Sequence, residues 1–189
     1  MTDPPEVWLY RDCYIDLAGR EFTEELSPAS HVTNLLRGDV ERGRGVFQRH
    51  FDIPCFAEYL RRAGGGADVY QERILPQVRD ILVAVYRAMG TAPSSLLEAG
   101  PGVRAGRLKR LGWDFLVDGG LRVWLVEANM LRNEYGLAAA NGPGGDVKRR
   151  LVQRLQEAEA ALLVARRGEG PAPEAFEDLS PLIAASLEK

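Results

Sequence analysis

Apolar residues recur along the chain with the spacing of two amphipathic helices. Between Ile74 and Met89 they repeat at intervals of three and four, which predicts a helix with one face in a core. Asp68 predicts its N-cap, and Pro76 within the pattern predicts a kink or a later start. A second amphipathic helix is predicted from Asp146 onward, and Pro54 predicts the start of a shorter one.

Aromatic and β-branched residues predict four strands. Two short ones are expected at 7–10 and 13–17. Two longer ones, Leu108–Val117 and Leu121–Ala128, flank Gly119-Gly120, a pair that can take positive φ in a two-residue hairpin turn. These elements predict an α+β fold with a mainly antiparallel sheet packed against helices.

The ends of the elements also predict the domain organisation. The pattern favours one domain over residues 1–167, because the chain from Gly168 is rich in Pro, Ala and Glu and predicts a flexible tail. Ser180-Pro181 could begin one short helix in that tail. Residues 37–49, with few apolar anchors, predict a loop.

Composition excludes several classes of protein. The chain of 189 residues is 46% hydrophobic and 27% charged, as in ordinary globular proteins, and it lacks the run of about 20 apolar residues that a membrane helix needs. Its net charge of −3 argues against nucleic-acid binding. Cys13 and Cys55 lack the spacing of a zinc site or disulfide framework, and no secretory signal precedes them, so a cytoplasmic location is expected.

The hairpin carries the candidate chemistry. A two-residue turn at Gly119-Gly120 places Asp114 opposite Leu125, so Asp114 and Glu127 share a face as diagonal neighbours about 7–8 Å apart. Asn129 points the same way if the strand continues. Two carboxylates and an amide oxygen suit a hard cation such as Mg²⁺.

A solvated strand surface is the alternative interpretation, since acidic residues on strands are usually exposed. In the predicted register, however, Leu116, Val123 and Leu125 lie on the same face as the carboxylates. A pair of like charges beside apolar neighbours is costly unless a cation neutralises it. That environment favours the metal site.

Three motifs resemble the tubulin–tyrosine ligase family. The hairpin reads Gly112-Trp113-Asp114-Phe115 and then Trp124-Leu125-Val126-Glu127-Ala128-Asn129, where the family has "GFDF" and "WLLEVN". His31-Val32-Thr33-Asn34 is similar to its "HLTN", and Leu9-Tyr10-Arg11 to the arginine-bearing strand before it. The motifs follow the family's order, and the resemblance covers roughly residues 6–165.

The resemblance implies a role for each matched residue. Asp114, Glu127 and Asn129 would bind Mg²⁺ beneath the phosphates of ATP, and Arg11 would contact the terminal phosphate or the acyl-phosphate. Thr33 and Asn34 would help to hold nucleotide and substrate. The alternatives are a strand-edge cation for Arg11 and an ordinary turn for Thr33 and Asn34. The two histidines are given no part in catalysis: His31 would orient its turn, and His50 would lie on the surface.

The resemblance also implies an activity and a fold. The family consists of ATP- and Mg²⁺-dependent carboxylate–amine ligases that add an amino acid to a protein or peptide, on an ATP-grasp fold. Residues 1–167 would correspond to the C-terminal half of that fold. Because Lys109, Lys148 and Lys189 all follow Arg11, the lysine-bearing nucleotide half is not represented, and the chain is expected to be a fragment, a truncated product or a remnant.

Two other functions stay open on the sequence. A non-catalytic remnant or protein-binding module would explain the missing half. An ATP-grasp ligase for a small amino acid or peptide would explain Met130-Leu131-Arg132-Asn133, which stands where the family usually has a proline-bearing segment.

Overall fold

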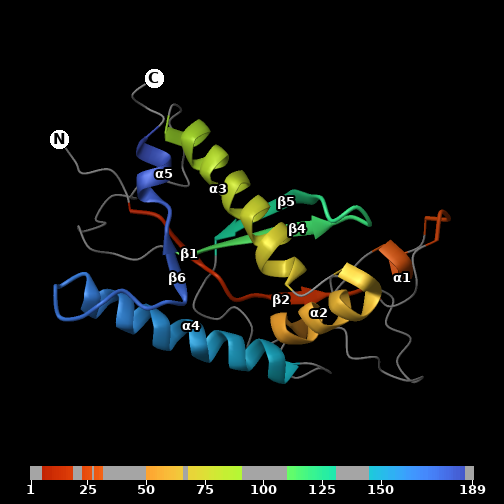
Figure 1. Ribbon diagram of the computed structural model, residues 1–189, viewed down its shortest axis with the longest axis horizontal. Coiled ribbons are helices and arrows are strands. Elements are labelled where there is room, and N and C mark those ends of the chain that lie inside the picture. The colour runs from red at the N-terminus through yellow and green to blue at the C-terminus, as the bar shows by residue number, and fades with distance from the viewer. Residues whose placement is uncertain are drawn as a thin grey trace. The chain divides into compact units, whose positions relative to one another are not determined.

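The computed structural model describes residues 6–18, 23–26, 28–31, 50–65, 68–90, 110–130 and 145–185 (Figure 1). The chain divides into two compact units. The first unit comprises Met1–Arg11, Asp68–Asn133 and Glu174–Lys189, and the second comprises Asp12–Ala67 and Glu134–Pro173. Each unit therefore combines segments that are distant in sequence.

The main helix of the first unit begins with a wide turn. The Asp68 carboxylate accepts a hydrogen bond from the backbone N–H of Gln71 at 3.2 Å, which confirms the predicted N-cap. A π-helical turn η2, Tyr70–Ile74, then leads into α3, Leu75–Gly90. Pro76 lies at this junction, where its missing N–H and its ring would disturb a regular α-helix. The π turn provides the change of geometry that the proline predicted.

The first and last strands of the chain pair with each other. β1, Trp8–Tyr10, is antiparallel to β6, Phe176–Asp178, and the rings of Tyr10 and Phe176 lie 5.2 Å apart. The backbone N–H of Leu179 donates to the carbonyl of Val7 at 2.8 Å, just beyond the strands. Helix α5, Ser180–Ala184, follows at the serine that predicted it.

The core of the first unit includes the end of the chain. Leu82 and Val83 of α3 are buried with Leu179, which is fully inaccessible at 0%. Trp113 and Phe115 pack against this cluster, as do Val7, Leu9, Val78 and Ile183. The structure thus differs from the expected flexible tail, because β6 and α5 supply part of the core. Composition predicted flexibility, but the pairing of β6 with β1 and the burial of Leu179 hold the segment in place.

A hairpin completes the first unit. β4, Leu111–Val117, pairs antiparallel with β5, Val123–Met130, and α3 lies against the hairpin in Figure 1. Both strands were predicted: β4 ends at Val117 as expected, and the other three ends differ by two or three residues. The α+β class and the antiparallel pairing are confirmed, although the described strands form three two-stranded sheets where one sheet was expected.

The second unit packs a long helix beside a small sheet. β2, Tyr14–Asp16, pairs antiparallel with β3, His50–Asp52. α2, Ile53–Leu60, follows directly with η1, Arg61–Gly65, and α4 spans Gly145–Ala165. A short α1 covers Pro28–His31. The predicted loop at 37–49 lies outside the described residues.

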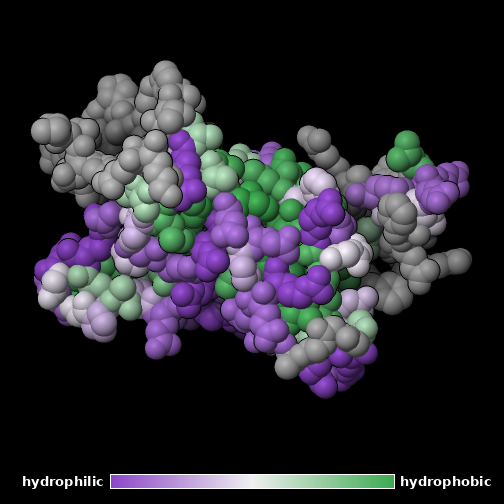
Figure 2. Space-filling view, turned by 45° about the horizontal axis from the view of Figure 1, so that its top comes forward, coloured by the Kyte–Doolittle hydropathy of each residue, from purple (hydrophilic) through white to green (hydrophobic). Residues whose placement is uncertain are grey.

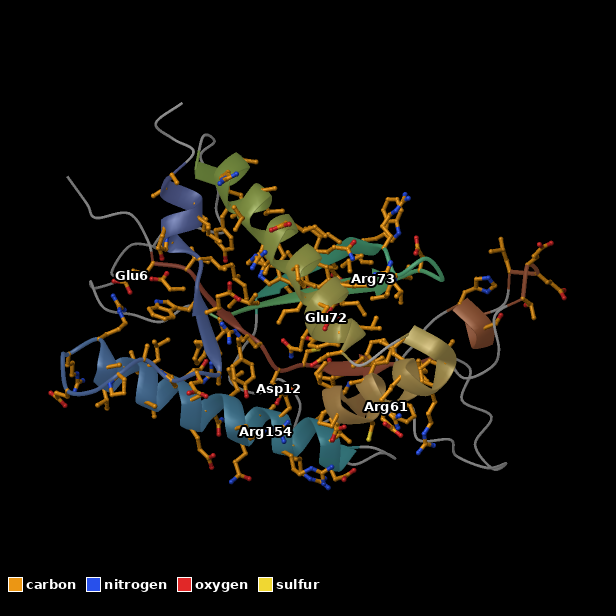
Figure 3. All side chains as sticks on the ribbon, in the orientation of Figure 1. Glu6, Asp12, Arg61, Glu72, Arg73 and Arg154 are labelled. Carbon is orange, nitrogen blue, oxygen red and sulfur yellow. The ribbon has the colours of Figure 1, made fainter. Side chains whose placement is uncertain are left out.

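Charged groups connect α4 to the N-terminal part of the second unit. Arg154 donates to one carboxylate oxygen of Asp12 at 2.6 and 3.0 Å, a contact that Figure 3 shows from the labelled residues. Six residues earlier along α4, Lys148 lies 3.5 Å from Asp16 and 4.2 Å from the ring centre of Tyr14. These contacts align the helix with β2.

The visible surface is mostly polar. Figure 2 shows one face on which hydrophilic residues predominate, with apolar residues in patches between them. None of the helices among the described residues combines the length and hydropathy of a membrane-spanning segment.

Candidate functional site

The hairpin turn differs from the predicted one in which residue adopts positive φ. Leu121 takes φ 62°, whereas Gly119 and Gly120 do not take positive values. The N–H of Leu121 donates to the carbonyl of Asp118 at 2.9 Å, and the N–H of Asp118 donates to the carbonyl of Arg122 at 3.0 Å. A left-handed residue after a tight turn makes the loop one residue longer than a Gly-Gly turn.

The Asp118 side chain organises this loop. Its carboxylate accepts from the backbone N–H of Gly120 and Arg122, each at 2.9 Å, and from the indole N–H of Trp124 at 3.0 Å. The indole donor above all, followed by these backbone N–H groups, holds the pKa of Asp118 below its usual value. The charged carboxylate therefore stabilises the turn.

The register of the hairpin was predicted wrongly by one residue at the turn. The structure pairs Val117 with Val123 and Phe115 with Leu125, whereas the two-residue turn implied Asp114 opposite Leu125. A β-bulge follows, with Val126 as the additional residue, so that Asp114 lies directly opposite Glu127. The longer turn and the bulge each shift the pairing by one.

These two shifts decide which side chains share a face. A one-residue shift in register moves the side chains of one strand to the opposite face of the hairpin. Two such shifts return the residues beyond the bulge to the face on which they were predicted. Asp114 and Glu127 therefore share a face, as predicted, but as direct and not diagonal neighbours. Direct pairs have Cβ atoms about 4.5–5.5 Å apart, against 7–8 Å or slightly less for diagonal ones.

Asn129 completes the set on this face. It lies opposite Gly112, whose lack of a side chain leaves room, and its amide nitrogen donates to Asp114 Oδ2 at 3.3 Å. The backbone ladder and this hydrogen bond thus bring all three predicted side chains to one exposed face of the hairpin.

The apolar surroundings assigned to this face need correction. Val123 and Leu125 lie between the turn and the bulge, so a single shift moves them to the face of Phe115, where Val123 is buried. Leu116 and its partner Trp124 share the carboxylate face, and they are 55% and 48% exposed. The carboxylates are consequently solvated. Removal from water therefore adds little to the free energy that a bound cation would gain at this site.

The donor chemistry nevertheless fits Mg²⁺. The set offers carboxylate and amide oxygens on an open surface, which suits a cation that keeps several waters and also binds phosphate oxygens. Asn129 would turn its carbonyl oxygen toward the cation in place of the amide nitrogen that now contacts Asp114. Among the described residues no group of three or more His, Cys, Asp or Glu has the arrangement of a metal site, so the set would have two carboxylate ligands only.

Arg11 is engaged elsewhere in the same unit. Its Nε lies 3.6 Å from Glu177 Oε2, and Glu177 Oε1 lies 3.8 Å from a guanidinium nitrogen of Arg79 on α3. Its backbone N–H donates to Ala175, which extends the β1–β6 pairing. The structure thus associates Arg11 with β6 and α3. A role at the phosphates would require the guanidinium to leave Glu177, and that role stays a prediction.

The remaining predicted residues lie largely outside the described structure. Thr33 and Asn34 are not among the described residues, nor is the side chain of His50. His31 Nδ1 lies 3.0 Å from the hydroxyl of Ser30 within α1. The nucleotide role of Thr33 and Asn34 therefore stays a prediction.

One residue that contacts the hairpin was missed from the sequence. Gln77 of α3 donates from Nε2 to the carbonyl of Leu121 at 2.9 Å and to that of Arg73 at 2.6 Å, and its Oε1 accepts from the N–H of Val123 at 3.2 Å. The only local signal is an amide placed next to Pro76 in an apolar helix pattern, and such a residue is usually a solvated one.

Comparison with known proteins supports the family resemblance. The chain is similar to tubulin glycylase 3B of Tetrahymena thermophila, with 26% identity over 133 residues, and to tubulin glycylase 3C of the same organism, with 27% identity over 140 residues. Each alignment covers 67% of this chain but only 10% and 12% of the relatives, so the chain spans about a tenth of their length. No family model and no solved structure matches the chain. Both relatives are members of the tubulin–tyrosine ligase family, and the similarity supports a tubulin–tyrosine ligase-like protein.

Proposed function

We propose that this chain carries the Mg²⁺–ATP face of a carboxylate–amine ligase of the tubulin–tyrosine ligase type. The observation that carries the proposal is the direct cross-strand pairing of Asp114 with Glu127, with Asn129 beside them on an exposed sheet face. The similarity to two tubulin glycylases supports a ligase that modifies a protein or peptide. The ATP-grasp architecture and the C-terminal-half assignment belong to this proposal.

Like charges opposed across a hairpin support a cation-binding role. Two carboxylates directly opposite each other destabilise a strand pair, and they do so in the absence of any cation. An opposite charge or a neutral residue at one of the two positions would avoid this repulsion. A bound cation would remove this repulsion, so the strand pair would be more stable with a metal bound than without one.

The proposed reaction asks little of the protein beyond positioning. ATP would phosphorylate a carboxylate, and an amine would displace the phosphate to form an amide. Magnesium, when bound, would neutralise charge on the phosphate oxygens. The β4–β5 ladder fixes the backbones of Asp114 and Glu127, and the Asn129 hydrogen bond orients the Asp114 carboxylate. Arg11, once released from Glu177, would supply a further positive charge to the phosphate.

Metal binding to the 189-residue chain tests the proposal. Mn²⁺ can replace Mg²⁺ as a paramagnetic probe, and Mg²⁺ should compete with it. We expect Glu127→Gln to weaken Mn²⁺ binding at least about tenfold, because it removes a charged ligand. The matched control is Glu157→Gln, which neutralises an exposed glutamate on α4 that accepts from Gln153.

Thermal unfolding supplies a second readout. Without metal, Glu127→Gln should leave the melting temperature equal or slightly higher, because one of two opposed charges is gone. Added Mg²⁺ should raise the melting temperature of the wild type and of Glu157→Gln only. Equal metal responses in all three proteins would refute the site, and the non-catalytic alternative would then be favoured.

A further inference from the structure

We infer that Gln77 is a positioning residue: it selects the hairpin register in which Asp114 and Glu127 stand directly opposite each other. The inference rests on the proposed function, because it concerns the same metal-binding face. The observation behind it is that the Gln77 carboxamide hydrogen-bonds to the backbone of Leu121 and of Val123, which sequence patterns did not predict.

The hairpin sequence permits two registers. A two-residue turn at Gly119-Gly120 would pair Asp118 with Leu121 and Asp114 with Leu125. The observed turn instead pairs Val117 with Val123 and places Leu121 at φ 62°. Hydrophobicity discriminates poorly between them, because β5 is apolar on both faces before the bulge: Val123 and Leu125 on one, Trp124 on the other.

The observed register places a branched side chain in an unfavourable conformation. Left-handed φ is disfavoured for every residue with a Cβ, whereas the Gly-Gly alternative would avoid this cost. Some other contact must therefore offset the strain at Leu121. Asp118 stabilises the turn from within the loop, and among the described residues Gln77 hydrogen-bonds it from outside the hairpin.

Gln77 can make its contacts only in the observed register. Residues on an antiparallel strand alternate between those whose N–H and carbonyl groups face the partner strand and those whose groups face outward. The Val123 N–H faces outward and meets Gln77 Oε1, while the Leu121 carbonyl meets Nε2. The carboxamide thus imitates a peptide unit of an adjacent strand. A one-residue slip would turn the Val123 N–H toward β4 and away from Gln77.

The rigid surroundings of Gln77 allow it to act in this way. Its Nε2 also donates to the carbonyl of Arg73, the residue labelled at the π-helical turn in Figure 3, at 2.6 Å. Pro76 and the π turn precede it, and Leu82 and Val83 further along α3 are buried. The amide is therefore held by the helix and presented to the hairpin edge.

The consequence for the metal face is geometric. In the observed register the bulge follows and places Asp114 opposite Glu127, close enough for both carboxylates to bind one cation. In the alternative register the two would be diagonal neighbours about 7–8 Å apart, so both side chains would have to extend toward each other to share one cation. Gln77 would thus strengthen metal binding without touching the metal.

Gln77→Ala tests the inference directly in the 189-residue chain. Nuclear Overhauser effects report the register: contacts between Asp114 and Glu127 should weaken, and contacts between Asp114 and Leu125 should appear. Mn²⁺ affinity should fall about 10- to 100-fold, as for other residues that orient metal ligands. Adding Leu121→Gly should restore both readouts, because glycine accepts the left-handed conformation without help from Gln77.

Rescue separates register selection from a general loss of stability, since Leu121→Gly removes apolar contact and would not repair an unfolded core. If Gln77→Ala does not fold, Gln77→Glu keeps the shape and the acceptor for Val123 but loses the donor to Leu121, and a mixed register is expected. Wild-type cross-strand contacts in the folded variant would overturn the inference. Failure of the wild type to bind Mn²⁺ would instead refute the proposed function, and the register measurement would still decide the role of Gln77.

Discussion

Backbone conformation at single residues shows which glycines matter. Gly168 takes φ +77° beyond the end of α4, where its N–H donates to Ala165 and the N–H of Glu169 donates to Val164. These bonds make a Schellman motif, in which a left-handed residue satisfies the last carbonyls of a helix. The glycines of the hairpin turn, in contrast, do not take positive φ.

Gly168→Ala should therefore destabilise the protein by about 1 kcal/mol, because alanine is strained at positive φ. The control is Gly170→Ala, a nearby position where an added Cβ meets nothing within 4 Å and φ is not in the left-handed range. Urea unfolding measures both. Equal free energies of unfolding for the two variants would contradict the assigned helix end.

Asp52 illustrates a pH-dependent contribution at the residue scale. Its carboxylate accepts from the backbone N–H of Cys55 at 3.0 Å and caps α2. That hydrogen bond holds the pKa of Asp52 below its ordinary value. Because the folded-state pKa is lowered, the stabilisation is present at neutral pH and is lost as the pH falls through the folded-state pKa.

Asp52→Ala should cost about 1 kcal/mol at pH 7, the usual value of an N-cap. The free-energy difference from the wild type should shrink on acidification, as the wild-type carboxylate becomes protonated. Asp52→Asn keeps an uncharged cap, so its cost should be smaller and should vary less with pH. A constant difference between wild type and Asp52→Ala across the acid range would argue against the charged cap.

At the scale of elements, the contact of α4 with β2 depends on Lys148. Its side chain is 12% exposed and lies near both the Asp16 carboxylate and the Tyr14 ring. Partial removal from water strengthens a cation–π contact and makes an unmatched charge costly. Arg150 on the same helix pairs with Asp146 one turn away but is 55% exposed.

Lys148→Met should lower stability by about 1–2 kcal/mol, since it retains the aliphatic length but removes the charge that faces Asp16 and Tyr14. Arg150→Met should cost at most about 0.5 kcal/mol, as for exposed pairs within a helix. Chemical denaturation at moderate salt compares them. A larger loss for Arg150→Met would show that the helix depends on its own charge pattern and not on β2.

At the scale of the whole molecule, segments distant in sequence complete each unit. β6 and α5 come after both segments of the second unit in the sequence. They belong to the first unit, where β6 pairs with β1 and Leu179 is buried against α3. The end of the described chain is therefore a structural part of the first unit.

Leu179→Ala should destabilise the protein by about 2–5 kcal/mol, the range for a leucine truncated in a core. Leu182→Ala, on α5 but 43% exposed, should change stability by about 0.5 kcal/mol or less. Calorimetric melting distinguishes them. Similar melting temperatures for both variants would show that residues 176–184 do not contribute to the core.

Local interactions explain what could be predicted from the sequence. The Asp68 cap, the disturbance at Pro76 and the helix beginning at Ser180 depend on neighbours within a few residues, and the structure contains each of them. The strands of the hairpin were predicted for the same reason, since two apolar runs flank a glycine pair.

The face shared by Asp114 and Glu127 was also predicted. The prediction is correct only because the structure contains two register shifts that cancel. The left-handed conformation of Leu121 and the bulge at Val126 each displace the pairing by one residue. Neither is visible in the alternation of apolar and polar residues, because β5 is apolar on both sides.

The sequence by itself therefore determined the two long helices, the strands of the hairpin, the Asp68 cap and the chemistry available on the hairpin, because these depend on short-range hydrogen bonding and periodicity. Only the tertiary structure decided how those groups are placed. Gln77 contacts the backbone of a hairpin more than forty residues away, Arg11 pairs with Glu177, and Leu179 enters a core formed by α3. Such contacts follow from which surfaces meet on folding, and a local pattern contains no information about its distant partner.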